Sequence, residues 1–265
     1  MTSTAPAALQ HDVTVVDTAP RDRLAPWVER LYDEIVLPRR QAAAAHPFTA
    51  AVGAGEVDRD VLRAYVEGLF WHITRARGLF AAFFAKRPGE VDAFLAGRAE
   101  DGKPPEEQAL RMRASLRALL ESFGTDADAF ERDLAGFRPP QEWWWHETQL
   151  RAAVFSDDLP WQVAAAAINA GTEGIVPWMC GPLSDALERG YGLSGQALEW
   201  LRYRISTDEV EHGDNGFLLL SHFVDAGDTA LQGACALYLE RLSLSTSRYL
   251  LDCGTRLSGG ATTVG

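Results

Sequence analysis

The sequence predicts an all-α protein, a single helical bundle of about eight helices. Apolar residues recur every three or four positions along most of the chain, which is the spacing of a helix that buries one face. No segment shows the alternation of apolar and polar residues that is typical of a half-buried strand. No linker between the helical segments is long enough to divide the 265 residues into two domains.

Each expected helix is bounded by residues that commonly start or stop one. Pro26 begins the first helix, since proline is tolerated in a first turn. Asp58, Ser194 and Asp228 cap later helices, because their side chains accept the free N–H groups of a first turn. Prolines and glycines end the segments. In order, the expected helices cover residues 26–45, 58–87, 90–98, 105–123, 126–137, 141–155, 160–190, 194–224 and 229–252.

Two of these helices are expected to be irregular. Pro38 disturbs the first one, because a proline inside a helix removes a backbone donor. Gly171, Gly174 and Pro177 are expected to kink the helix that starts at Pro160.

The expected domain organisation is simple. Residues 1–24 form a flexible tail, which has neither the basic nor the apolar region of a signal peptide. Residues 25–255 form the helical bundle, and residues 256–265 form a second flexible tail. No apolar run approaches the length of a membrane span.

Charge and cysteine content exclude several classes of function. Asp and Glu outnumber Lys and Arg by 37 to 25, and the net charge of −12 repels phosphate backbones and anionic lipids. We therefore expect no nucleic-acid partner and no membrane partner. Cys180, Cys235 and Cys253 have the spacing of neither a disulfide framework nor a zinc site, which favours a reducing cytoplasm.

The first candidate site lies where an apolar helix face is interrupted. In the 194–224 helix, this face continues into Asp208 or Glu209 and then into His212. A carboxylate and an imidazole one turn apart can bind one metal ion or exchange a proton. The structural alternative is that the acids face water or pair with Arg204, and that His212 is a hydrogen-bonded, half-buried histidine.

Glu173 is the second candidate, because it is the only charged residue between Leu159 and Asp185. Burying a carboxylate is costly unless it is paired, protonated or bound to a metal. Asn169 lies one turn earlier on the same face and is a candidate for substrate binding. The structural alternative is that Glu173 accepts backbone N–H groups that are freed at the kink.

Three more residues complete the candidates. Glu106 lies one turn before the apolar face of the 105–123 helix, although its N-terminal position also suits a carboxylate for electrostatic reasons. Arg113 lies on the same face two turns later, where it either extends past the core or binds an anion. His72 lies beside the apolar face of the 58–87 helix, either as a satisfied core histidine or as a catalytic group.

A resemblance to a known superfamily rests on two features: the segment HPFTAAVGAGEVDRDVLRAYVEGLFWHITRARGLFAAFFAKRP, and Glu173 followed later by DEVEHGDNGF. Over roughly residues 26–255 the chain resembles the haem-oxygenase-like superfamily. That group includes thiaminase-II-like proteins, pyrroloquinoline-quinone synthase and non-haem di-iron oxidases and oxygenases. The resemblance implies a haem-oxygenase-like helical bundle and, for the iron-containing branch, O₂-dependent chemistry.

The same resemblance implies a set of iron ligands from three core helices. These are Glu106 (or Glu100 or Glu107), Glu173, Asp208 or Glu209, and His212. We expect Glu173 and His212 to face each other across the interior of the bundle.

Two histidines of the iron-containing pattern are missing. Arg111 or Arg113 stands where one is expected, and Arg204 and Ile205 stand where another belongs. Neither Arg nor Ile binds iron, so the sequence lacks two ligands of a standard di-iron site.

Three functions are compatible with these residues. The first is an iron-dependent oxidoreductase that acts on a small amino-acid-like or carboxylate metabolite in a biosynthetic pathway. The second is a cofactor-independent oxidase, like the quinone synthase, in which His72 and His212 move protons and Arg113 and Arg204 bind an anionic substrate. The third is a non-catalytic helical binding protein. The expected cofactor is iron, or none. The expected partners are a small-molecule substrate and O₂. A homodimer is the expected assembly if the chain forms one.

Overall fold

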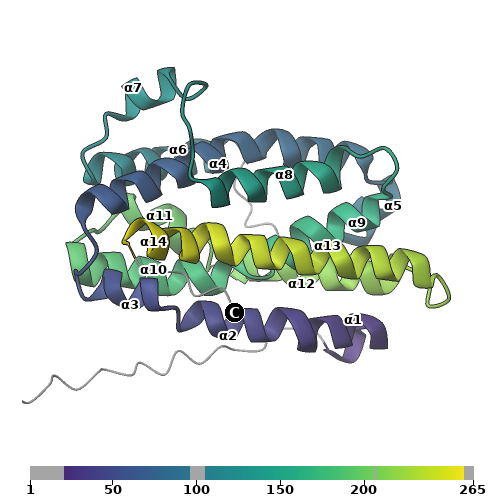
Figure 1. Ribbon diagram of the computed structural model, residues 1–265. Coiled ribbons are helices and arrows are strands. Elements are labelled where there is room, and N and C mark those ends of the chain that lie inside the picture. Colours follow the sequence, from purple (N-terminus) through teal and green to yellow (C-terminus); the bar gives the residue numbers. More distant parts are fainter. Residues whose placement is uncertain (1–20, 96–104, 206, 260–265) are drawn as a thin grey trace, which may run out of the picture.

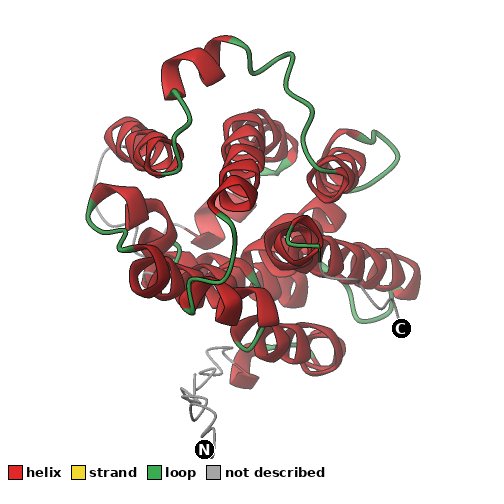
Figure 2. Cartoon of the chain, turned by 60° about the vertical axis from the view of Figure 1, so that its left-hand side comes forward, coloured by secondary structure: helices red, strands yellow, loops and turns green. Residues whose placement is uncertain are grey.

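The computed structural model describes residues 21–95, 105–205 and 207–259, with their side chains except at positions 77, 80, 105, 106, 108 and 207–212. This part of the chain consists of helices joined by turns and loops and contains no strand (Figure 2). The expected all-α fold is therefore confirmed. The division into one domain and two tails stays a prediction.

The helices follow one another in an order close to the expected one. Their bounds are α1 (Pro26–Leu31), α2 (Leu37–Ala44), α3 (Pro47–Gly53), α4 (Arg59–Lys86), α5 (Gly89–Leu95), α6 (Pro105–Ser122), α7 (Ala127–Arg132), α8 (Gln141–Phe155), α9 (Trp161–Ala165), α10 (Val176–Tyr191), α11 (Gln196–Tyr203), α12 (Thr207–Phe223), α13 (Thr229–Ser247) and α14 (Cys253–Leu257). Three π-helices connect some of them end to end, at Tyr32–Val36, Ala166–Glu173 and Arg248–Asp252.

The helices are arranged in layers (Figure 1). The first layer contains α4, α6 and α8, the middle layer contains α9 to α14, and α1 to α3 lie on the opposite side of the middle layer. The π-helix Ala166–Glu173, which we call the central π-helix, packs between α12 and α13. Its position in the middle of the bundle places the end that carries Glu173 in the interior.

The expected helix starts are largely confirmed by capping contacts. The side chain of Asp58 accepts a hydrogen bond from the backbone N of Asp60 at the start of α4, at 2.7 Å. Asp228 caps α13 by accepting a hydrogen bond from the backbone N of Leu231 at 2.9 Å. At α11, the residue before the helix is Gly195 rather than Ser194, and its φ of 56° is one that glycine adopts without strain.

Pro38 does not end the first helical segment, because α2 continues through it to Ala44. The π-helix Tyr32–Val36 comes immediately before α2, so Pro38 lies in the first turn of α2, where a missing N–H costs little. The kink expected near Gly171, Gly174 and Pro177 is confirmed, since the central π-helix ends at Glu173 and α10 begins at Val176.

The single helix expected over 194–224 is wrong, because α11 ends at Tyr203 and α12 begins at Thr207. The two helices pack on different neighbours: α11 lies against α6, whereas α12 lies against the central π-helix. One straight helix cannot reach both surfaces. The bundle consequently has more separate helices than the eight expected.

Two other expected boundaries differ. The helix expected over 126–137 ends at Arg132, where the chain enters turns before Gly136 and two prolines. The last helical segment continues through α14 to Leu257, past the expected domain end at 255. No helix in the described ranges is both long and apolar enough to cross a membrane.

Candidate functional site

A cavity of about 460 Å³ lies between the first and middle layers of the bundle. Side chains of α4, α6, α8, the central π-helix, α10, α11 and the π-helix Arg248–Asp252 line it. Most of these side chains are apolar, such as Ile73, Leu79, Met112, Leu116 and Ile168. The polar ones in the described wall are His72, Thr74, Arg113, Thr172, Glu173, Tyr203, Arg204 and Tyr249.

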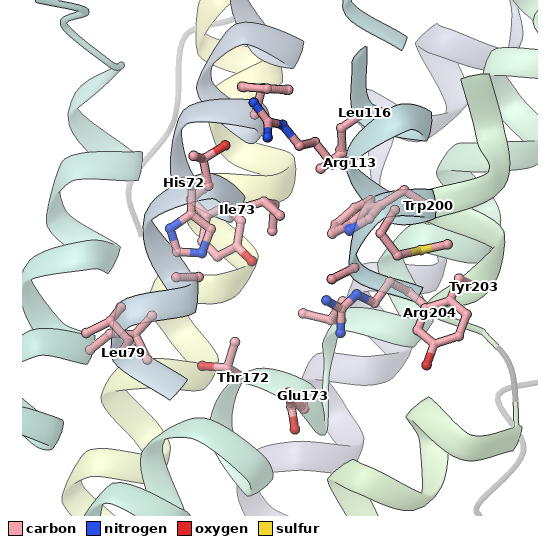
Figure 3. A pocket seen from close by; sticks show the side chains of 18 of the residues that line it. His72, Ile73, Leu79, Arg113, Leu116, Thr172, Glu173, Trp200, Tyr203 and Arg204 are labelled. Atoms are coloured by element: carbon pink, nitrogen blue, oxygen red, sulfur yellow. The ribbon is translucent and has the colours of Figure 1, made fainter. Parts of the chain in front are cut away.

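His72 forms part of the α4 wall of the cavity (Figure 3). It is 3% exposed to solvent, and its Nδ1 lies 3.4 Å from Oε2 of the equally buried Glu147 on α8. The contact directs Nδ1 away from the cavity, which leaves Nε2 as the ring nitrogen available to a bound molecule. The structure thus places His72 in the core and at the cavity at the same time.

Aromatic rings surround His72 on its buried side. Its ring centroid lies 5.0 Å from that of His146 and 5.1 Å from that of Tyr249. The Nδ1 of His146 is hydrogen bonded to Oγ of Ser245 at 2.8 Å. Burial, and then the neighbouring His72, hold the pKa of His146 well below its ordinary value, so this ring is neutral at pH 7.

Glu173 lies at another wall, at the end of the central π-helix (Figure 3). Nδ2 of Asn169, one turn earlier, donates a hydrogen bond to Oε2 of Glu173 at 3.2 Å. At the kink, the backbone N–H groups of Gly174 and Ile175 donate to the carbonyl oxygens of Asn169 and Thr172. The hydrogen bond from Asn169 orients the Glu173 carboxylate from its own helix.

Arg204 follows α11 and extends into the cavity from the side opposite His72 (Figure 3). Its guanidinium lies over the ring of Trp200, with 5.2 Å from Cζ to the ring centroid. Tyr203 lies next to it in the cavity wall. The backbone N of Arg204 still donates to the carbonyl oxygen of Trp200, so Arg204 continues the side of α11 that brings Trp200 and Tyr203 to the cavity.

Arg113 lies at the rim of the cavity rather than in the interior. Its side chain is 51% exposed, and it pairs with Glu131 through Nε–Oε1 and Nη2–Oε2 hydrogen bonds of 3.0 and 2.7 Å. Hydrogen bonding to Glu131 raises the pKa of Arg113 above its ordinary value. Arg113 thus extends past the core to Glu131 near the end of α7, which is one of the two expected arrangements. Its role in binding an anion stays a prediction.

Four of the candidate iron ligands lie outside the described side chains: Glu106, Asp208, Glu209 and His212. Their helices are described, and α12 approaches the central π-helix very closely. A Cβ added to Gly213 would lie 3.1 Å from the carbonyl oxygen of Glu173. The expected meeting of the Glu173 and His212 side chains stays a prediction.

The described residues alone do not fit an iron site. No three His, Cys, Asp or Glu side chains converge within the described part of the chain, whereas iron centres of this kind need at least three such ligands. Glu173 and His72, the described cavity residues of these types, come from different walls.

Several residues of the site were missed by the sequence analysis. Glu147 and His146 are buried together with Trp143 and Leu150 on one face of α8. Their spacing of three, four and seven residues was a usable signal, because it is the spacing of one helix face. Tyr249 carried no such signal, since it lies in a π-helix where the ordinary spacing does not hold.

Comparisons with known proteins support the fold. No family model matches the sequence, and no curated protein matches it. Among solved structures, the chain is similar to a TenA homolog from Pseudomonas syringae pv. tomato str. DC3000, with a TM-score of 0.65, 14% identity, and coverage of 87% of this chain and 93% of that one. At this identity the similarity shows the fold alone. The chain therefore has an all-α fold similar to that of this TenA homolog.

Proposed function

We propose that the chain is an enzyme that binds a small, largely apolar carboxylate in the cavity and removes a proton from it with His72. One observation carries this proposal: an imidazole and a guanidinium, those of His72 and Arg204, face the same cavity from opposite sides. This arrangement favours the cofactor-independent alternative over a non-catalytic binding protein, because it places an acid–base group and a cation in one cavity.

The shape and chemistry of the cavity support the substrate class. A volume of about 460 Å³ is that of a small-metabolite site. The apolar wall would hold the body of the substrate, and Arg204 would bind its carboxylate, since a guanidinium can donate two parallel hydrogen bonds to a carboxylate. Glu173 would accept a hydrogen bond from an amino group, which extends the class to amino-acid-like substrates.

The chemistry begins with a proton transfer. Nε2 of His72 takes a proton from the substrate, and the hydroxyl of Tyr249 stays protonated because burial raises the pKa of Tyr249. Oxidation of the substrate is proposed from the resemblance. In that reaction the substrate loses two protons and two electrons. O₂ accepts these two protons and two electrons and leaves as hydrogen peroxide.

The iron-dependent oxidation is the alternative implied by the resemblance. It would use Glu173 with Glu106, Asp208 or Glu209, and His212, and bound iron would supply the activation of O₂. The described residues do not by themselves make an iron site.

Binding is tested with phenylacetate, a small carboxylate with an apolar ring, and with uncharged phenylacetamide. Arg204→Gln is expected to weaken phenylacetate binding by roughly ten- to a hundred-fold, since hydrogen bonds to charged groups contribute about 1.5–3 kcal/mol. Arg202→Gln is the matched control, because Arg202 lies two residues earlier, in the last turn of α11, but pairs with Glu188 at the surface. Equal loss of phenylacetamide and phenylacetate affinity in Arg204→Gln would contradict the assigned role.

Catalysis is tested by O₂ consumption and peroxide release with a set of small carboxylic and amino acids. His72→Gln is expected to abolish turnover, and His222→Gln, which changes an exposed histidine of α12, is expected to leave it intact. Activity in the presence of a chelator supports the cofactor-independent mechanism. Turnover that requires anaerobic loading with Fe(II), and that is lost in Glu173→Ala, would instead support the iron enzyme, and ligand binding without any turnover would support a binding protein.

A further inference from the structure

Glu147 is a buried carboxylate that lies behind His72 as seen from the cavity. It is 2% exposed and belongs to α8, whereas His72 belongs to α4. It is absent from the cavity wall, so it does not touch a bound substrate. A carboxylate so deeply buried requires compensating partners.

Three cationic or protonatable groups converge on this carboxylate. Oε1 accepts hydrogen bonds from Arg151, with 2.9 Å to Nε and 2.8 Å to Nη2, and lies 3.4 Å from Nε of Arg75. Oε2 lies 3.4 Å from Nδ1 of His72. The two guanidiniums approach from the partly exposed side, whereas the imidazole lies on the cavity side.

The carboxylate is ionised. Burial raises the pKa of Glu147, but hydrogen bonding and charge attraction from His72, together with hydrogen bonding from Arg151, outweigh burial and lower this pKa below its ordinary value. An ionised carboxylate accepts hydrogen bonds and donates none. The nitrogen that faces it must therefore carry the proton, so that neutral His72 is held with Nδ1 protonated and with the lone pair on Nε2.

Two other titratable neighbours, His146 and Tyr249, do not compete for this role, and Tyr249 stays protonated because burial raises its pKa. The ring of His146 is neutral because burial lowers its pKa, and its Nδ1 is hydrogen bonded to Ser245. Its ring contacts the side of His72 with a centroid distance of 5.0 Å. Glu147 is thus the group that distinguishes the two ring nitrogens of His72.

We propose that Glu147 is a positioning residue that fixes His72 in the tautomer with a free Nε2, ready to accept a proton from a substrate in the cavity. This inference rests on the proposed function, in which His72 is the base. It adds the residue that makes the base competent.

The experiment reads the tautomer directly, by nitrogen NMR of the full chain labelled with ¹⁵N-histidine at a pH where His72 is neutral. His72→Gln assigns the signals of His72. We expect wild-type His72 to be protonated on Nδ1, and Glu147→Gln to lower the ratio of this tautomer to the other by about ten-fold or more, since the negative charge that lies 3.4 Å from Nδ1 is removed.

The matched control is Glu142→Gln, the same change on the same helix at a carboxylate that pairs with Arg256 at the surface. It should leave the His72 signals unchanged. Phenylacetate binding should be retained in both variants, which shows that the cavity is intact. Once a substrate is known, Glu147→Gln should lower kcat and leave KM nearly unchanged.

Two outcomes overturn the inference: wild-type His72 protonated on Nε2, or a tautomer ratio in Glu147→Gln equal to that in Glu142→Gln. The first requires no variant at position 147, so it applies even if Glu147→Gln does not fold. Failure of the proposed function looks different. In that case the tautomer still depends on Glu147, but His72→Gln and Arg204→Gln change neither turnover nor phenylacetate binding.

Discussion

Arg40 and Gly174, which lie 134 residues apart in the sequence, are joined in the interior by a hydrogen bond of 2.6 Å from Nε to the carbonyl oxygen. The kink leaves this carbonyl without its usual helical partners, because Pro177 has no N–H and the N–H of Trp178 donates to Ile175. Arg40 supplies the missing donor from α2. The backbone next to Glu173 is therefore held in place by the side chain of Arg40, which comes from a different layer of the bundle.

Replacing this guanidinium should destabilise the fold. Arg40 is 1% exposed, donates to the hydroxyl of Tyr32 at 2.9 Å and lies 3.6 Å from Oδ1 of the buried Asp214. Arg40→Met is expected to lower the free energy of unfolding by about 3–5 kcal/mol, since it leaves a buried carboxylate without this partner. Urea denaturation measures the change, and the exposed Arg30→Met serves as the control. A loss equal to that of Arg30→Met would show that Arg40 does not stabilise the kink.

The contact between α12 and the central π-helix should tolerate no side chain at Gly216. A Cβ there would lie 2.6 Å from both the backbone N of Ala170 and the Cβ of Asn169. Gly216→Ala is expected to cost roughly 1–3 kcal/mol, because the two backbones must separate. Gly233→Ala is the matched control in α13, where a Cβ meets nothing within 4 Å. Gly233→Ala should stabilise the folded chain by about 0.5–1 kcal/mol. Thermal unfolding should therefore show a lower midpoint for Gly216→Ala and a higher midpoint for Gly233→Ala.

The buried His146 should make stability depend on pH in a defined range. Its pKa is well below the ordinary value in the folded chain, whereas in the unfolded chain it is about 6.5. As the pH falls below about 6.5, the unfolded chain binds a proton that folded His146 does not, so stability falls by up to about 1.4 kcal/mol per pH unit. Above that pH this contribution is fully present.

His146→Leu should remove this part of the pH dependence. Urea denaturation between about pH 4.5 and 7 measures the contribution of His146 to stability separately from that of Glu147. The lowered pKa of Glu147 affects stability only at lower pH, below the ordinary carboxylate range of about 4.3–4.5. His222→Gln, at an exposed histidine, is the control. An unchanged slope in His146→Leu would mean that folded His146 takes up a proton in this range.

The three cysteine thiols should be unreactive in the folded chain. All three are buried, and burial raises the pKa of Cys235 and of Cys253 to about 12. At pH 8 such thiols are roughly one part in ten thousand thiolate, which is the reactive form. Titration with a thiol reagent should detect no rapid reaction in the native protein and three thiols in denaturant. Arg30→Cys, at an exposed position, is a positive control. Rapid reaction of a native thiol would contradict the buried environment described here.

The sequence by itself determined the all-α class, most helix starts and the kink near Gly174, because these depend on local spacing, capping residues and backbone chemistry. It also indicated Glu173 as a charge within an apolar stretch and His72 as a histidine beside an apolar helix face. Such signals are visible within one helix, where a face is defined by positions three and four apart.

Only the tertiary structure decided which of these residues share a cavity and which residues support them. The packing of α11 against α6 brings Arg204 to the cavity, and Glu131 holds Arg113 at the rim. Glu147 becomes significant only because α8 packs against α4 beside His72. The physical reason is that helix spacing fixes which side chains lie on one face, whereas the packing of separate helices fixes which faces meet.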